Sequence, residues 1–169
     1  MKPAEAINLI QNAISTNQPQ RWADLGCGSG TFTLALKNLL PKGSQITAID
    51  KQHQKLPVNF IKIDFETDDL PLSSLDGILM ANSFHYIRDK PRLIKKLENY
   101  FAANPTFLII EYDTIRSNPW VPYPINYPQL QQFFQTLGYA SITKLAEAPS
   151  SFGGRIYSVL SQLKIPAES

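Results

Sequence analysis

Cysteine and charge of one sign are both scarce in this sequence. Cys27 is the single cysteine among 169 residues, which excludes a disulfide within one chain and a cysteine-based zinc site. Because 16 Lys and Arg stand against 14 Asp and Glu, the formal net charge is only +2. Binding to a phosphate backbone needs many clustered cations, so we expect no nucleic acid partner. The one local group of cations, Lys90, Arg92, Lys95 and Lys96, is interpreted as the solvated face of a helix.

Long hydrophobic runs are also absent. No segment approaches the roughly twenty apolar residues that a membrane-spanning helix needs, and the N-terminus MKPAEAINLIQNAIS lacks the pattern of a signal peptide. We therefore expect no membrane span, and a cytoplasmic location, which the single cysteine also favours. A composition of 43% hydrophobic and 18% charged residues over this length is typical of one globular domain. Residues 1–169 are predicted to form it.

Short apolar runs alternate with amphipathic stretches along most of the chain. This alternation predicts an α/β fold, a Rossmann-like doubly wound and mostly parallel seven-stranded sheet. The last two strands have no helix between them and are predicted to form an antiparallel hairpin. The predicted strands are 21–25, 46–49, 59–63, 75–80, 107–110, 139–145 and 155–160. The predicted helices are an opening helix over 6–14, then 31–40, one around 93–97, and 130–137, with a proline-rich loop over 117–128.

A glycine-rich turn follows the first predicted strand, in the text ADLGCGSGTF at 23–32. A dinucleotide site usually has the spacing G-x-G-x-x-G and binds a diphosphate at the helix N-terminus. Here Thr31 stands where the third glycine of that pattern would fall, and Asp24 precedes the turn. A carboxylate at this place disfavours a diphosphate and suits a ligand that carries positive charge. The glycines are Gly26, Gly28 and Gly30.

Further stretches repeat the order and spacing of one known family. They are AID at 48–50, IDFETDDLPLSSLDGIL at 63–79, ANSFHYIRD at 81–89 and FLIIEY at 107–112. Together with the glycine turn, they make residues 21–139 resemble the class I S-adenosylmethionine-dependent methyltransferases. The resemblance is to the small-molecule type, typified by the enzymes of ubiquinone and menaquinone biosynthesis.

The resemblance implies that S-adenosylmethionine is the methyl donor and S-adenosylhomocysteine the product. Asp50 would accept the ribose hydroxyls, a role shared with nicotinamide enzymes, and Asp64 would accept from the adenine amino group. Asp50 and Asp64 could instead only cap the following segments, Asp24 could only hold the turn, and Cys27 is interpreted as a small residue in a tight turn. The implied donor-binding residues are Asp24, Gly26, Cys27, Gly28, Gly30, Asp50, Lys51, Asp64, Phe65 and Asn82.

The acceptor implied by the resemblance is an oxygen, nitrogen or carbon of a small molecule. Enzymes that methylate amide or base nitrogens usually carry Asn/Asp-Pro-Pro-Tyr/Phe after the fourth strand, where this chain has NSFH at 82–85. His85 is the candidate general base, since its ordinary pKa lies near neutrality, and a packing role is the alternative. The acceptor-site candidates are Tyr86, Tyr112, Trp120 and Tyr123, the last two in a loop that would be either a lid or a simple cover for the sheet.

The chain departs from the family at 51–57, where relatives usually have a full helix. This short connection is predicted to offer a surface for a second copy of the chain or for another protein. Two other functions stay open. One is a non-catalytic binding or scaffolding protein with this fold, and the other is an NAD-dependent Rossmann enzyme. No metal site is expected.

Overall fold

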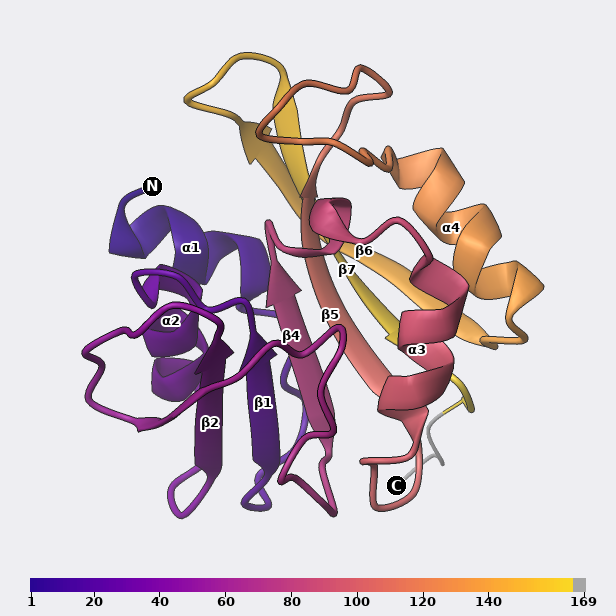
Figure 1. The fold of residues 1–169 in the computed structure, drawn as a ribbon. Helices are drawn as coiled ribbons and strands as arrows, with labels where there is room; N and C mark the ends of the chain where they lie inside the picture. Colours follow the sequence, from indigo (N-terminus) through magenta and orange to yellow (C-terminus); the bar gives the residue numbers. More distant parts are fainter. Residues whose placement is uncertain (166–169) are drawn as a thin grey trace.

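The computed structural model describes residues 1–165, which form a seven-stranded sheet in the order β3-β2-β1-β4-β5-β7-β6 (Figure 1). Strands β1 to β5 run parallel, and β7 pairs antiparallel with both β5 and β6. The predicted α/β fold and the C-terminal antiparallel strands are confirmed. The strands are β1 (Arg21–Leu25), β2 (Gln45–Asp50), β3 (Asn59–Lys62), β4 (Gly77–Ala81), β5 (Thr106–Tyr112), β6 (Ser141–Pro149) and β7 (Arg155–Gln162).

Two pairs of helices cover the two faces of this sheet (Figure 1). Phe107 and Ile109 of β5 belong to the core with α3 and α4, whereas Leu108 and Ile110 belong to the core with α1 and α2. Because successive side chains of a strand point to opposite faces, a strand covered on both sides is apolar throughout. The helices are α1 (Pro3–Ile10), α2 (Thr31–Leu39), the 3₁₀ turn η1 (Phe84–Tyr86), α3 (Lys90–Glu98) and α4 (Tyr127–Thr136).

Several predicted element boundaries are wrong. Among the strands, β4 is Gly77–Ala81 rather than 75–80, and β6 is Ser141–Pro149 rather than 139–145. The opening helix ends at Ile10 rather than at Ile14, and the chain continues in a turn in which Ala13 N donates to Ile10 O over 2.9 Å. The proline-rich loop ends earlier than predicted, because Asn126 caps α4 and Pro128 lies in its first turn. Proline is tolerated there, since its missing N–H would have no partner within the helix.

The interpretation of the α3 cations as a solvated face is wrong for two of the four. Lys90 is buried, and its Nζ donates to Ile87 O over 2.9 Å and to Tyr123 O over 2.8 Å. Lys96 is half-buried, and its Nζ donates to the carbonyls of Phe65, at 2.9 Å, Glu66 and Asp68. Both ammonium groups therefore fix loops to α3.

The connection between β2 and β3 has no helix, as predicted. Residues 51–58 run as an irregular loop, and a groove of about 470 Å³ lies beside it, between the C-terminal end of α2 and the start of β2. Among residues 1–165, no helix has the length and hydrophobicity that crossing a membrane requires.

Candidate active site

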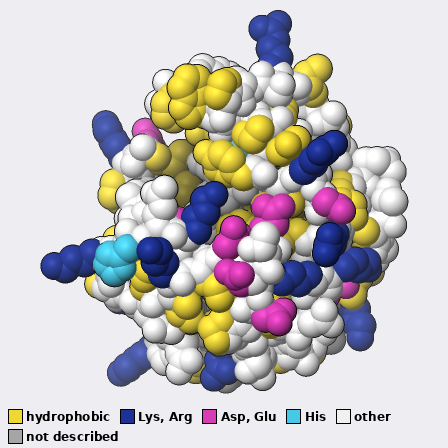
Figure 2. Space-filling model, in the orientation of Figure 1, with side chains coloured by type: hydrophobic (Ala, Val, Ile, Leu, Met, Phe, Trp, Pro, Cys, Tyr) yellow, Lys and Arg dark blue, Asp and Glu magenta, His cyan; other side chains and the backbone are white. Residues whose placement is uncertain are grey.

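A pocket of about 600 Å³ opens at the C-terminal ends of β1 to β4. In an open α/β sheet, ligands bind outside the carboxyl ends of the strands, at the point where the strand order reverses. Figure 2 shows acidic side chains gathered near the middle of this face of the molecule. The lining includes nine of the ten predicted donor residues, Asp24, Gly26, Cys27, Gly28, Asp50, Lys51, Asp64, Phe65 and Asn82, and also Tyr86.

The glycine turn is bound directly to the neighbouring strand. The backbone N–H groups of Gly26 and Cys27 both donate to Ile49 O, at 2.8 and 3.0 Å. Gly26 has φ +74°, and a Cβ there would lie 2.6 Å from Ser83 Cβ, so no larger residue fits. Gly30 does not line the pocket. Gly30 is the N-cap of α2 and has φ +86°. Its missing side chain leaves room for the Leu56 side chain, so the role of Gly30 is in packing.

Asp50 and Asp64 lie at the predicted strand ends and line the same pocket. Asp50 accepts hydrogen bonds from Gly28 N and Gln52 N, both at 2.9 Å, and so connects the glycine turn to the end of β2. Asp64 accepts from Glu66 N at 3.0 Å, at the start of the turn that Lys96 holds. Each carboxylate thus shapes its own loop, and each still borders the cavity.

Asp24 is almost fully buried at the base of the pocket. Its Oδ2 accepts from Thr33 Oγ1 at 2.5 Å, whereas its Oδ1 has no hydrogen-bond partner among residues 1–165. Burial raises the pKa of Asp24 from 3.8 to about 7, the Thr33 hydrogen bond opposes this rise, and the nearby Asp50 charge adds to it. The side-chain oxygen of Asn82, a residue at φ +53°, is likewise buried and without a partner in this part of the chain.

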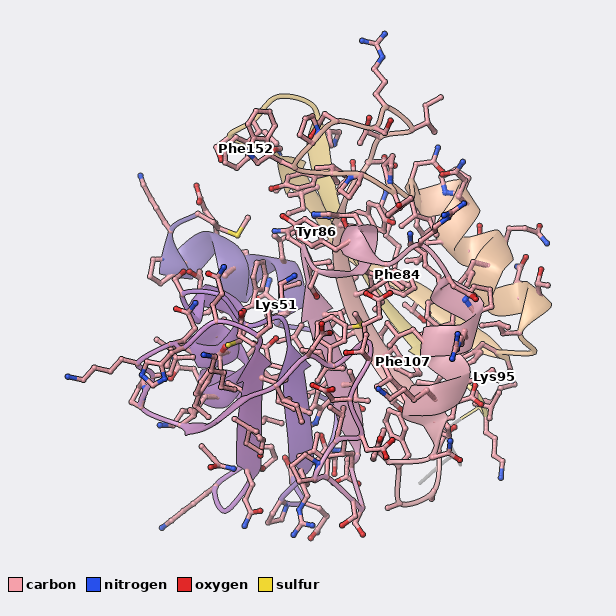
Figure 3. The ribbon with its side chains drawn as sticks, in the orientation of Figure 1. Lys51, Phe84, Tyr86, Lys95, Phe107 and Phe152 are labelled. Atoms are coloured by element: carbon pink, nitrogen blue, oxygen red, sulfur yellow. The ribbon has the colours of Figure 1, made fainter. Side chains whose placement is uncertain are left out.

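The electrostatics of the pocket favour a cationic ligand. Of the charged side chains that line it within residues 1–165, four are acidic, Asp24, Asp50, Asp64 and Glu66, and one is basic, Lys51. Lys51 lies in the loop after β2 (Figure 3). Burial raises the pKa of Cys27 to about 12, and the charges of Asp24 and Asp50 add to the rise, which disfavours the reactive thiolate form.

His85 pairs with a carboxylate from a different strand. His85 Nδ1 lies 2.8 Å from Glu111 Oε2, and His85 N donates to Glu111 Oε1 at 3.0 Å. The two residues are 2% and 0% exposed, and neither lines the pocket. Glu111 therefore fixes the orientation of the imidazole, which the sequence reasoning did not detect because the residues are separated by a whole helix.

The predicted acceptor residues do not all lie together. Tyr86 is 53% exposed and lines the pocket, whereas Tyr112 lies outside the lining. The His85 ring lies 4.4 Å from Tyr86 and 5.8 Å from Tyr112. Trp120 is 75% exposed and does not line the pocket. Tyr123 also lies outside the lining, but its N–H donates to His85 O at 2.9 Å. The loop is thus attached to the His85 segment.

Comparisons with known proteins agree with this geometry. Residues 3–148 match the model of a methyltransferase domain family. The malonyl-[acyl-carrier protein] O-methyltransferase of Bacillus anthracis is 28% identical over 111 residues, 60% of this chain and 41% of that enzyme. The chain thus spans about two fifths of the length of this curated relative.

Solved structures show the same fold at low sequence identity. A SAM-dependent methyltransferase from Aquifex aeolicus superposes with a TM-score of 0.65 at 15% identity, over 97% of this chain and 100% of that one. The YcgJ protein of Bacillus subtilis gives a TM-score of 0.71 at 11% identity, over 96% and 100%. The chain therefore belongs to the methyltransferase domain family. Its fold is that of the class I enzymes that use S-adenosylmethionine.

Proposed function

We propose that this chain binds S-adenosylmethionine and transfers the methyl group to an oxygen, nitrogen or carbon of a small molecule. The observation that carries the proposal is the joining of the glycine turn, Asp50 and Asp64 in one pocket of about 600 Å³. That volume lies within the range of roughly 300–1,000 Å³ of small-molecule sites. One solved structure with a similar fold is the 1,6-didemethyltoxoflavin-N1-methyltransferase of Burkholderia thailandensis, an enzyme that methylates a small molecule.

The residues present fit this methyl donor. Asp50, Asp64 and Phe65 line the pocket; in this proposal Asp50 accepts hydrogen bonds from the ribose hydroxyls, and Asp64 and Phe65 bind the adenine. Asp24 Oδ1 and Asn82 Oδ1 are buried and have no hydrogen-bond partner within residues 1–165. Such atoms cost free energy unless a ligand supplies a hydrogen-bond donor. The ammonium group of the donor's methionine part is such a partner. When bound, S-adenosylmethionine supplies a methyl carbon activated by a positive sulfur, and the excess of carboxylates suits that charge.

The protein's own contribution to transfer is alignment, exclusion of water and removal of a proton from the acceptor. His85 is the base in this proposal. In this proposal Nδ1 donates to Glu111 Oε2, 2.8 Å away, which leaves Nε2 as the acceptor of the proton, and the buried carboxylate stabilises the imidazolium that forms. Because the His85 ring is 2% exposed and lies outside the pocket lining, Nε2 must become accessible when the acceptor binds. This role is needed for a hydroxyl or an acidic C–H, whereas an amine acceptor can lose its proton to solvent.

Calorimetric titration tests donor binding. We expect heat release with S-adenosylhomocysteine and none with NAD. Asp50→Ala and Asp64→Ala should each lower the affinity at least tenfold, since a hydrogen bond to a charged group contributes about 1.5–3 kcal/mol. Asp69→Ala is the matched control, because Asp69 is an exposed carboxylate of the same loop outside the pocket lining. Unchanged affinity in both site variants, or binding of NAD alone, would refute the assignment.

A scaffolding function without methyl transfer is the second candidate. The observation that favours it is the groove of about 470 Å³ beside the helix-free connection 51–58. A second copy of the chain or another protein docked there would cover that side of the sheet. Donor binding without turnover of any acceptor, together with complex formation that Val58→Asp abolishes, would favour this function over the enzyme.

A further inference from the structure

We propose that Tyr86, Tyr112 and Phe152 form the binding surface for a methyl acceptor with a flat, uncharged, aromatic body. We call these three residues the aromatic surface. The inference rests on the proposed function, since it assigns the surface to the molecule that receives the methyl group. Phe152 belongs to the turn between β6 and β7 and is not suggested by any motif of the sequence.

The three rings belong to one row of ring contacts that begins at the donor pocket and passes through the buried His85 ring between Tyr86 and Tyr112. Tyr86 lines that pocket, the His85 ring lies 4.4 Å from Tyr86 and 5.8 Å from Tyr112, and Phe152 meets Tyr112 edge-on at 6.3 Å. The residues come from η1, the end of β5 and the β6–β7 turn. Three separate segments therefore contribute rings to this row, of which Tyr86 alone among the three lines the pocket.

Phe152 is 85% exposed at the tip of a hydrogen-bonded turn. Its N–H donates to Ser150 Oγ at 3.1 Å, Ser150 N donates to Gly154 O at 2.9 Å, and Gly153 and Gly154 have φ of +90° and +67°. None of these bonds requires a phenyl ring, so a polar side chain would satisfy the turn equally well. Because the backbone is already fixed, little conformational entropy is lost when a ligand covers the ring.

The chemistry of the row favours an uncharged aromatic ligand. Glu111 is 0% exposed beneath it and is bound to His85, so its charge does not face the ligand. Burial raises the pKa of Tyr112 from its usual value of 10.0, and Glu111 and Tyr86 add to the rise, which keeps the phenol neutral. Figure 2 shows hydrophobic side chains gathered where Figure 3 labels Phe152 and Tyr86.

A small molecule fits this arrangement better than a protein. The row leads into a concave pocket, as small-molecule sites do. Aromatic rings stack or meet edge-to-face with a gain of roughly 0.5–1.5 kcal/mol per pair beyond their buried area. A planar acceptor lying along the row would have its near end at Tyr86, beside the pocket that holds the methyl donor in the proposed function.

The test uses 2-naphthol as the probe, titrated by NMR into the full chain with and without saturating S-adenosylhomocysteine. We expect Phe152→Ser to weaken 2-naphthol binding about five- to tenfold and to leave the affinity for S-adenosylhomocysteine unchanged. Leu34→Ser is the control, because Leu34 is an exposed apolar residue of α2 outside the pocket lining, and it should change neither affinity.

Equal 2-naphthol affinity in wild type and Phe152→Ser would overturn the inference, as would no binding to the wild type. Two other outcomes would also overturn the inference: dimer formation measured by sedimentation, or binding to phosphatidylcholine vesicles, in either case abolished by Phe152→Ser while the affinity for 2-naphthol stays unchanged. Either outcome would assign the aromatic surface to a different partner. Failure of S-adenosylhomocysteine to bind the wild type would count against the proposed function separately, because the probe is also titrated alone.

Discussion

Replacing Asp24 with asparagine should make the protein more stable at neutral pH and remove part of its pH dependence. In the unfolded chain this carboxyl loses its proton near pH 3.8, but in the folded protein burial moves the pKa to about 7. Between these values the folded state binds one proton more than the unfolded state. Stability therefore falls as pH rises through this window, and the full cost of the buried charge is present above pH 7.

The magnitude follows from the size of the shift. A shift from 3.8 to about 7, at about 1.36 kcal/mol for each pKa unit, amounts to a cost on the order of 4 kcal/mol above pH 7. The asparagine side chain of the variant keeps an oxygen for the hydrogen bond that Thr33 Oγ1 donates at 2.5 Å. The variant should equal the wild type near pH 4 and exceed it progressively up to pH 7.

Urea unfolding at a series of pH values from 4 to 8 measures this difference. The gap in unfolding free energy between Asp24→Asn and the wild type should widen by about 1.4 kcal/mol per pH unit and level off above pH 7. Asp69→Asn, at an exposed position, should run parallel to the wild type. A gap that does not change with pH would refute a protonated Asp24 in the folded protein.

Two further predictions concern side chains that hold another segment in place, Lys96 and Glu111. Lys96→Met keeps the aliphatic chain but removes the ammonium that binds three carbonyls of the 65–68 turn. Affinity for S-adenosylhomocysteine should fall about tenfold by calorimetry, and Lys95→Met, at an exposed position, should not change it. Glu111→Gln should lower kcat for an identified hydroxyl or C–H acceptor about 100-fold without changing donor affinity. An unaltered kcat would contradict the role of His85 as a base oriented by Glu111.

Local sequence indicated where the pocket at the ends of β1 to β4 lies. Gly26 requires a positive φ and no Cβ, and Asp50 follows directly from the end of an apolar strand. Parallel strands place their carboxyl ends at one edge of the sheet, and Asp50 and Asp64, which follow β2 and β3, line one pocket, as the family resemblance implied. The exception is Gly30, which has the predicted position in the motif but packs against Leu56 instead of lining the pocket.

The contacts between segments could not be read from the sequence. A lysine on a helix is usually solvated, and only the packing of the 120s loop and of the 65–68 turn against α3 shows why Lys90 and Lys96 are withdrawn from solvent. In the same way, the turn after β6 carries an exposed phenylalanine whose position beside Tyr112 depends on the pairing of β7 with β5.

Glycine spacing, strand periodicity and the carboxylates at strand ends are local properties, and by themselves they predicted the fold class and the place of the pocket, whereas the methyl donor proposed for it was implied by the family resemblance. Tertiary structure alone decided which side chains meet across elements. The pairing of His85 with Glu111 and the row from Tyr86 to Phe152 depend on strand order and register. Burial and charge, which set the pKa of Asp24 at about 7, are likewise products of the whole packing, because a pKa depends on everything that surrounds the group.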